Sequence, residues 1–329
     1  MPELRKDPIT GRWVIIAENR AGRPDEFSAS GEAAAGGSCP FCEGNEQQTP
    51  GEVFAWREPH SEPNGPGWRV RVVPNQFPAL QPEGDAGRSS AGLYETMGGV
   101  GVHELVIESP HHLHSTTDLS VENVREVLDA YRLRLIALKR DPRLVYGMIF
   151  KNVGPAAGAS LFHTHSQLIV TPVLPILVEE EMLGAARYHG EHGRCVYCAM
   201  IEEELAAKAR MVHETATSVA FCPFAGRHPH ETWILPNSHA SHFEDITPDI
   251  LADVAAALHD VLGQIERSLD RPAYNYIIHT APFNAPPLGH YHWHIEIIPR
   301  RTRIAGFEWG TGFYINATPP EVAAAKMRE

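Results

Sequence analysis

Two histidines and an amide, His163, His165 and Gln167, alternate with other residues directly before the apolar run 168–170. The stretch predicts the start of a β-strand, in which residues i, i+2 and i+4 point to the same face, so these three side chains should lie together. The small residues at 158–160 let the backbone turn tightly and approach a ligand closely. A neutral imidazole can attack phosphorus and an amide can hold a non-bridging oxygen, so the pattern favours phosphoryl transfer. A half-buried strand whose histidines only face solvent is the alternative.

For attack on phosphorus, His165 must have a particular protonation state, and further polar side chains must surround the nucleotide. The imidazole must be neutral, with its proton on the ring nitrogen that does not attack, and a backbone carbonyl usually fixes that tautomer. Asn152 and Gly154 precede the small-residue loop and are candidate nucleotide contacts. Arg20 and Arg23 can pair with phosphates bidentately, although either one alone is more often a solvated surface residue.

Five cysteines form two Cys-x-x-Cys pairs, Cys39 with Cys42 and Cys195 with Cys198, and leave Cys222 alone. In a cytosolic chain such pairs, together with distant histidines, indicate zinc rather than disulfides. Cys222 lies among apolar residues and is expected to be a small buried side chain. Each cysteine pair therefore needs two histidines to complete a tetrahedral site.

The motifs of the first half recur in the same order in the second half. After each cysteine pair come a histidine that begins a predicted strand, a histidine nine residues later, a helix and an H-x-H pair. The two series are His103, His112, His163 and His165, and His230, His239, His292 and His294. This agreement of order and spacing indicates an internal duplication.

The duplication supplies the missing zinc ligands, because two cysteines and two histidines make a closed tetrahedral set. We predict two zinc sites, one formed by Cys39, Cys42, His112 and His163 and the other by Cys195, Cys198, His239 and His292. The neighbouring His111, His114 and His242 are alternative ligands.

The two halves differ at the residue that follows the H-x-H pair. The first half has Gln167 and the second has Glu296, whose charge would repel a phosphate oxygen that an amide would bind. We therefore expect the first half to be catalytic and the second to be a scaffold with a structural zinc. His279, His294, Glu296 and one acid of 179–181 could gather a further divalent metal, and ordinary polar residues around a sheet are the alternative.

Length and charge limit the classes of protein. At 329 residues the chain predicts two domains, which we place at 1–178 and 179–329. The net charge of −13 disfavours nucleic acid or an anionic membrane as a partner. No apolar run approaches the roughly 20 residues of a membrane span and the N-terminus lacks a signal-peptide core, so a cytoplasmic protein is expected.

The patterns predict strands within 6–16, 68–73, 102–108, 145–150 and 168–170, helices at 119–140 and 248–269, and surface loops at 58–67 and 81–92.

Several short motifs, each weak alone, together resemble one family. They are DPITGRW at 7–13, RxxRP at 20–24, PNQFP at 74–78, SPHH at 109–112, HxHxQ at 163–167, APFN at 281–284 and GTGFYIN at 310–316. This set resembles the galactose-1-phosphate uridylyltransferases, the nucleotidyl-transferase branch of the histidine-triad superfamily, over nearly the whole chain. The resemblance implies an α+β fold of two histidine-triad-like halves, each an antiparallel sheet with packed helices, and a homodimer.

The resemblance also implies an activity and its site residues. It implies exchange of UMP between UDP-glucose and galactose 1-phosphate, a reaction of Leloir galactose metabolism, by a double displacement in which His165 forms a uridylyl-histidine and Gln167 holds the phosphoryl oxygens. The implied nucleotide contacts are Asn75, Asn152 and Ser160, and the implied phosphate contacts are Arg20 and Arg23. Glu181, His279, His294 and Glu296 match the family's optional second metal site, although the last ligand there is usually histidine.

Three departures from the family pattern bear on the substrate. Thr164 stands where the uridylyltransferases usually have proline, Ser166 replaces their usual glycine, and 306–310 lacks a lysine that some members direct at the sugar phosphate. The H-x-H-S-Q form and the second Cys-x-x-Cys pair also resemble the plant-type ADP-glucose phosphorylase, which transfers adenylyl to phosphate. We therefore expect nucleotidyl transfer, with uridylyl exchange as the first interpretation and adenylyl transfer as the alternative.

Two further interpretations use the same residues. A dinucleoside-polyphosphate phosphorylase or hydrolase would employ the same histidine on a different nucleotide. A non-catalytic scaffold that binds two zinc ions would need only the cysteine and histidine sets, and it would leave His165 and Gln167 without a role.

Overall fold

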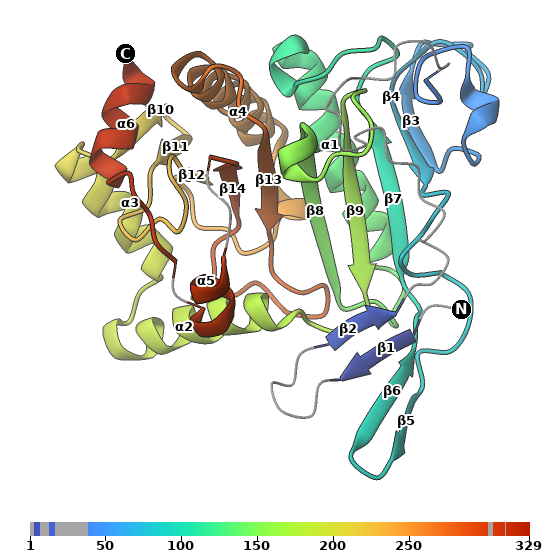
Figure 1. Ribbon diagram of the computed structural model, residues 1–329, viewed down its shortest axis with the longest axis horizontal. Coiled ribbons are helices and arrows are strands. Elements are labelled where there is room, and N and C mark those ends of the chain that lie inside the picture. Colours follow the sequence, from blue (N-terminus) through green and yellow to red (C-terminus); the bar gives the residue numbers. More distant parts are fainter. Residues whose placement is uncertain (1–2, 7–12, 17–38, 302–304, 313) are drawn as a thin grey trace.

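A ten-stranded antiparallel sheet runs through the molecule and carries both halves of the chain (Figure 1). The computed structural model describes residues 3–6, 13–16, 39–301, 305–312 and 314–329, so that Arg20 and Arg23 lie outside the described residues. The strand order is β10-β11-β12-β14-β13-β8-β9-β7-β4-β3, and each neighbouring pair is antiparallel.

The order of strands repeats about the junction between β8 and β13. The first half contributes β3 (Phe54–Arg57), β4 (Trp68–Pro74), β7 (Val102–Ile107), β8 (Tyr146–Val153) and β9 (His165–Thr171). The second half contributes β10 (Met211–Glu214), β11 (Ser218–Phe221), β12 (Thr232–Pro236), β13 (Tyr274–His279) and β14 (His294–Pro299). Counted outward from the junction, each half has its fourth, fifth, third, second and first strand along the chain. The predicted α+β class with two related halves is confirmed.

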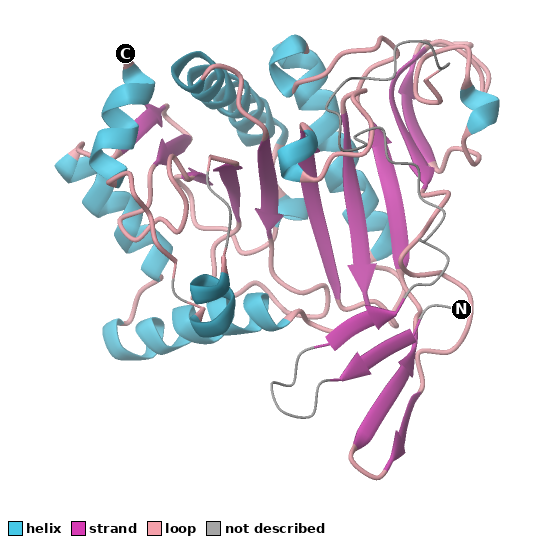
Figure 2. Cartoon of the chain, in the orientation of Figure 1, coloured by secondary structure: helices cyan, strands magenta, loops and turns pink. Residues whose placement is uncertain are grey.

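Each half has one long helix between its third and fourth strands, α1 (Val121–Leu138) in the first and α4 (Pro248–Leu269) in the second. These helices contact the sheet and each other (Figures 1 and 2). A stripe of buried apolar side chains, three or four residues apart, faces the sheet from α4; it includes Leu251, Val254, Leu258, Val261, Ile265 and Leu269. Both helices agree with the predicted ranges to within two residues, and a single apolar core joins the two halves.

Shorter elements surround this core. They are α2 (Ile176–His192), α3 (Val196–Ala207), α5 (Gly306–Thr311) and α6 (Pro320–Arg328). The division predicted at 178/179 falls within α2, and it stays a prediction. Among the described residues, no helix is both long enough and apolar enough to cross a membrane.

A second sheet of four strands projects from one end of the molecule (Figure 2). Its order is β2 (Trp13–Ile16), β1 (Glu3–Lys6), β6 (Tyr94–Gly98) and β5 (Arg88–Ala91). The prediction of a surface loop at 81–92 is therefore wrong in part, because β5 lies within it. All four residues of β5 are exposed and show no apolar alternation, and backbone pairing with β6 alone makes the segment a strand.

Candidate active site and metal centres

His165 is the first residue of β9, and its ring is held by the backbone. Its Nδ1 lies 2.7 Å from the carbonyl oxygen of His163. Since a carbonyl oxygen only accepts, Nδ1 carries the proton, and in the neutral ring Nε2 carries the lone pair. The geometry therefore agrees with the expected tautomer. The edge-on ring of Phe41, with centroids 5.3 Å apart, packs against the imidazole.

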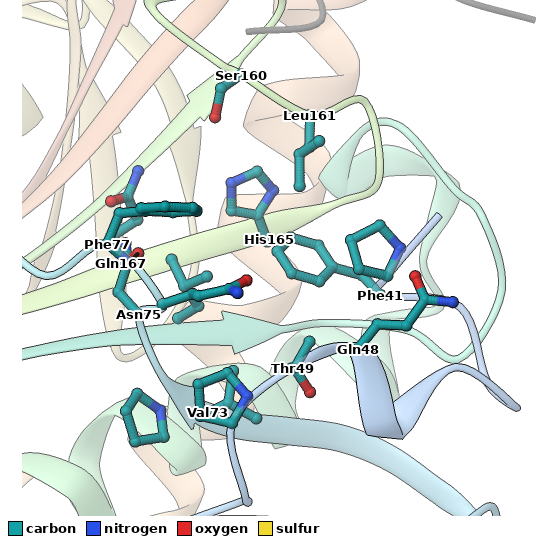
Figure 3. A pocket seen from close by; sticks show the side chains of 15 residues that line it. Phe41, Gln48, Thr49, Val73, Asn75, Phe77, Ser160, Leu161, His165 and Gln167 are labelled. Atoms are coloured by element: carbon teal, nitrogen blue, oxygen red, sulfur yellow. Dashed lines mark hydrogen bonds between the residues drawn. The ribbon is translucent and has the colours of Figure 1, made fainter. Parts of the chain in front are cut away.

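A largely apolar cavity of about 230 Å³ opens beside His165 (Figure 3). Its walls include Phe41, Val73, Phe77, Leu105 and Leu161, with the polar side chains Gln48, Asn75, Ser160 and Gln167 among them. Flat apolar walls with a few directed polar groups suit a nucleobase and its ribose. Four of the predicted site residues, His165, Gln167, Asn75 and Ser160, therefore meet at one cavity.

His165 also lines a second cavity, of about 340 Å³, most of whose lining residues are polar or charged. His165 and Leu161 line both cavities. The predicted contact Asn152 lines only the second, where its Oδ1 accepts a hydrogen bond of 2.7 Å from Asn275 of β13. A histidine that lines both cavities suits a reaction centre with a nucleoside in one cavity and a phosphate-bearing group in the other.

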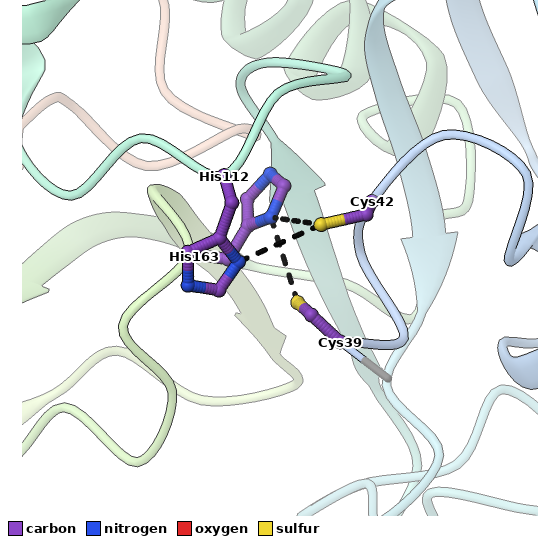
Figure 4. Close-up of side chains that lie close together, drawn as sticks. All are labelled: Cys39, Cys42, His112 and His163. Atoms are coloured by element: carbon purple, nitrogen blue, oxygen red, sulfur yellow. Dashed lines mark hydrogen bonds between the residues drawn. The ribbon is translucent and has the colours of Figure 1, made fainter. Parts of the chain in front are cut away.

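The first predicted zinc set comes together from three loops (Figure 4). The Nδ1 of His163 lies 3.5 Å from Cys39 Sγ and 3.6 Å from Cys42 Sγ, and the Nδ1 of His112 lies 3.5 Å from Cys42 Sγ. Tetrahedral zinc with bonds of about 2.3 Å to sulfur and 2.0–2.1 Å to nitrogen separates these ligand atoms by about 3.5 Å. The His163 Nε2 donates to the carbonyl of Ser109 at 2.8 Å, which leaves the Nδ1 lone pair for a metal.

The second predicted set shows the same arrangement. Cys198 Sγ lies 3.4 Å from the Nδ1 of His239 and 3.7 Å from the Nδ1 of His292, and Cys195 completes the group. The His239 Nε2 donates to the carbonyl of Leu288 at 2.9 Å. The ligand atoms of each set lie within 4.8 Å of one another, and the alternative His111, His114 and His242 belong to neither. Both sets thus fit zinc by donor type and by spacing.

The further metal site predicted at four residues forms from three of them. Glu181, His279 and His294 come together, whereas Glu296 is not part of the group. Glu296 forms an ion pair with Arg227, and its Oε2 lies 3.2 Å from His279 Nε2. The group therefore contains three of the four predicted ligands, and Glu296 as a ligand stays a prediction, since an arginine distant in sequence binds its carboxylate.

His294, the counterpart of His165, is covered. Its Nδ1 lies 3.2 Å from the His292 carbonyl, so the ring is oriented as in the first half. Its Nε2, however, lies 3.3 Å from Glu181 of α2, and the ring stacks between Trp233 and His279. Only 1% of His294 is exposed. Of these two counterparts, His165 lines two cavities, whereas Glu181, Trp233 and His279 cover His294.

A buried polar network behind β9 explains two departures from the family pattern. The Thr164 hydroxyl lies 2.6 Å from Lys151 Nζ and 2.6 Å from Glu108, and Lys151 and Glu108 form an ion pair. The Ser166 hydroxyl accepts a hydrogen bond of 2.5 Å from Tyr131 of α1. Proline and glycine carry no side-chain hydroxyl. Thr164 and Ser166 therefore link the strand that begins at His165 to a charged pair and to α1.

The buried pair predicts a large effect on stability. Lys151 and Glu108 are 0% and 1% exposed, and although burial opposes it, the Lys151 charge lowers the pKa of Glu108. Lys151→Met leaves the carboxylate buried without its partner, so the free energy of unfolding should fall by about 3–5 kcal/mol. Urea unfolding measures this. Lys208→Met is the matched control, because its pair with Glu214 is exposed and should contribute at most about 1 kcal/mol. Equal losses in the two variants would contradict the assignment.

Comparison with known proteins agrees with this architecture. A sequence profile described as galactose-1-phosphate uridyl transferase, N-terminal domain, matches residues 1–175, and one described as a domain of unknown function matches 101–329. The fold and the profile match together define a nucleotidyltransferase. The chain belongs to the galactose-1-phosphate uridyl transferase family of enzymes.

Individual relatives cover the whole chain. The ADP-glucose phosphorylase of Arabidopsis thaliana is 38% identical over 100% of this chain and 93% of its own length. The galactose-1-phosphate uridylyltransferase of Thermotoga maritima is 27% identical over 100% of this chain and 98% of its own. A solved uridylyltransferase mutant superposes with a TM-score of 0.83 at 28% identity, covering 99% of this chain and 96% of its own. The Arabidopsis phosphorylase with bound ADP-glucose superposes with a TM-score of 0.78 at 36% identity, covering 100% and 99%.

Proposed function

We propose that the chain transfers a nucleotidyl group from a nucleoside-diphosphate sugar in two displacements through His165. The observation that supports this most is the orientation of the His165 imidazole, which donates a hydrogen bond from Nδ1 to the His163 carbonyl and lines two cavities. Nucleophilic catalysis by a histidine requires a neutral ring with its lone pair directed at the substrate.

In the first displacement, His165 Nε2 attacks the α-phosphorus of the nucleotide. A nitrogen–phosphorus bond forms, the bond from phosphorus to the bridging oxygen breaks, and the sugar 1-phosphate leaves. In the second, an oxygen of the acceptor phosphate attacks the same phosphorus and releases His165. Gln167 holds a non-bridging oxygen, and Asn75 and Ser160 contact the nucleotide. Asn152, predicted from the sequence as a nucleotide contact, lines the second cavity and is proposed to contact the phosphate-bearing group there. Arg20 and Arg23 are proposed as further phosphate contacts.

We propose ADP-glucose as the donor and inorganic phosphate as the acceptor. This choice draws on the relative of 38% identity, whose name specifies this activity, against 27% for a uridylyltransferase. Thr164, Ser166 and the second cysteine–histidine set also favour ADP-glucose and inorganic phosphate as the substrates. This choice of substrates replaces our first interpretation, UMP exchange between UDP-glucose and galactose 1-phosphate. That exchange remains the second candidate because of the match to the family profile.

The metals, the assembly and the location complete the proposal. Zinc bound at Cys39, Cys42, His112 and His163, and at Cys195, Cys198, His239 and His292, would have four protein ligands and would stabilise the fold without a position for substrate. A further divalent metal is proposed at Glu181, His279 and His294. We propose a cytoplasmic homodimer that acts on small phosphorylated sugars rather than on nucleic acid or membranes, in keeping with its acidic charge.

Intact-mass measurement after incubation with ADP-glucose, with UDP-glucose and with diadenosine tetraphosphate, without acceptor, tests the proposal. We expect a stable gain of one adenylyl group from ADP-glucose that inorganic phosphate removes as ADP. A uridylyl adduct that galactose 1-phosphate removes would establish the second candidate. An adduct from diadenosine tetraphosphate alone would identify a dinucleoside-polyphosphate enzyme. No adduct with any donor would overturn the covalent mechanism and favour a zinc-binding scaffold.

A further inference from the structure

His103 lies directly behind Gln167 and Asn75, two residues that line the apolar cavity, although the sequence pattern suggests no role for it at the site. In the pairing of β7 with β9, Leu105 lies opposite Gln167 and His103 lies opposite Ile169. His103 is therefore the diagonal neighbour of Gln167 on the same face of the sheet. Its Nε2 lies 2.9 Å from Gln167 Oε1, and only 3% of the residue is exposed.

Hydrogen bonds on the other side of the ring decide which atom of His103 donates. The backbone N–H of Ala79 donates to His103 Nδ1 at 3.1 Å, so Nδ1 has the lone pair and Nε2 has the proton. The Nε2–H can only donate, and Gln167 Oε1 must accept. The Gln167 amide is thereby oriented with its NH2 group as the part that remains to contact a ligand.

Asn75 is oriented in the same sense. Its Oδ1 accepts from the backbone N–H of Phe77 at 2.9 Å, which leaves its Nδ2 as the donor. That Nδ2 lies 3.0 Å from His103 Nε2. The pocket wall therefore presents amide N–H groups, to which an anionic oxygen of a ligand would be a suitable acceptor (Figure 3).

The second half of the chain offers an internal comparison. Trp233 lies opposite Glu296 as Leu105 lies opposite Gln167, so the counterpart of His103 is Glu231. The alignment of His230 with His103 made from the sequence is therefore wrong by one residue, because motif spacing does not reveal the register of the strands. Burial and the Glu296 carboxylate raise the pKa of Glu231 to about 7. A histidine–amide pair thus accompanies the cavity-facing His165, and a carboxylate pair accompanies the covered His294.

We propose that His103 is a positioning residue that fixes the Gln167 amide so that its NH2 group, and not its oxygen, meets the α-phosphoryl group of the nucleotide. This inference rests on the proposed function. A glutamine amide that lacks such a partner can flip by 180°, and its oxygen would then repel the phosphoryl oxygens. The contribution of His103 should therefore appear in the rate of phosphoryl transfer more than in the affinity for the nucleotide sugar.

The rate of covalent adduct formation, measured by rapid quench and intact mass, tests this role. His103→Ala is expected to slow the step about tenfold to a hundredfold, less than or equal to the usual effect of removing an oxyanion donor. The dissociation constant of the nucleotide sugar should change less than about threefold, since the oriented amide is expected to stabilise the transition state more than the bound ground state. His103→Gln places an amide nitrogen near the Nε2 position and should restore most of the rate. His213→Ala removes a partly buried histidine that binds Asp260 and is the matched control.

A double-variant comparison separates positioning from a structural role. Because His103 acts through the glutamine, His103→Ala should have no further effect on the rate in a Gln167→Ala protein. Losses that multiply in the double variant, or no rescue by His103→Gln in a protein of unchanged melting temperature, would overturn the inference. If the wild-type protein forms no adduct, the proposed function fails first. If the wild-type protein and His103→Ala form it equally fast, only the positioning role fails.

Discussion

Replacing His165 by asparagine is expected to abolish the covalent adduct and to reduce turnover by at least about 10⁴-fold, since removal of a nucleophile typically costs up to about 10⁶. Asparagine can retain the hydrogen bond to the His163 carbonyl, which the His165 Nδ1 makes at 2.7 Å, so the start of β9 should keep its conformation. What is lost is the Nε2 lone pair. Intact mass after incubation with ADP-glucose and steady-state turnover measure the two effects, and the melting temperature reports the fold.

His294→Asn is the matched control, because His294 occupies the corresponding first position of β14 and has the corresponding bond to the carbonyl of His292. Its Nε2 faces Glu181 rather than a cavity. We expect this variant to form the adduct at a rate within a few fold of wild type, even where its melting temperature is lower. An adduct in His165→Asn, or its loss in His294→Asn with the fold intact, would place the nucleophile elsewhere.

Features that depend on residue type and spacing were predictable from the sequence. Cys-x-x-Cys pairs have few common roles, so the repetition of cysteine pairs and histidines was sufficient to identify both four-residue cysteine–histidine sets. The alternation of His163, His165 and Gln167 placed His165 and Gln167 on one face of a strand, and both line the same cavity. The helix periodicities were similarly strong, since α1 and α4 each carry a long apolar stripe.

Features that depend on pairing between distant segments were not predictable. The ion pair of Lys151 with Glu108, the bond from His103 to Gln167, and the bond from Arg227 to Glu296 each join separate strands or loops. Nothing in the local pattern distinguishes these residues from ordinary strand residues. The one-residue difference in register between the halves likewise follows from how β12 meets β14, which the chain spacing does not reveal.

The duplication is compatible with the different roles that we propose for the two halves. Each half has an H-x-H pair whose first histidine joins a cysteine–histidine set and whose second is oriented by the first histidine's carbonyl. In the second half, Glu181 of α2 and the ring of Trp233 cover that second histidine. The same local geometry therefore places His165 beside a cavity in one half and buries His294 in the other.

Loss of a zinc ligand should affect the two halves differently. Cys42→Ser and Cys198→Ser should each lose about one equivalent of zinc per chain, measured by elemental analysis, and each should lower the melting temperature. Structural zinc sites in isolated peptides contribute about 10–16 kcal/mol of binding free energy, so a lost ligand is expected to be strongly destabilising. Only the first set, however, contains the residue whose carbonyl orients the ring of His165.

Covalent labelling is therefore expected to separate the two variants. Loss of metal at Cys42 frees the Nδ1 of His163, and a shift of that residue moves the carbonyl that holds the His165 proton, so adduct formation should slow at least about tenfold. In Cys198→Ser the corresponding shift moves His292 and the covered His294, and labelling should continue near the wild-type rate below the melting temperature. Equal slowing in both variants would mean that zinc acts only through overall stability. Unchanged labelling in Cys42→Ser with its zinc lost would show that the strand and the Ser109 carbonyl hold His163 without the metal.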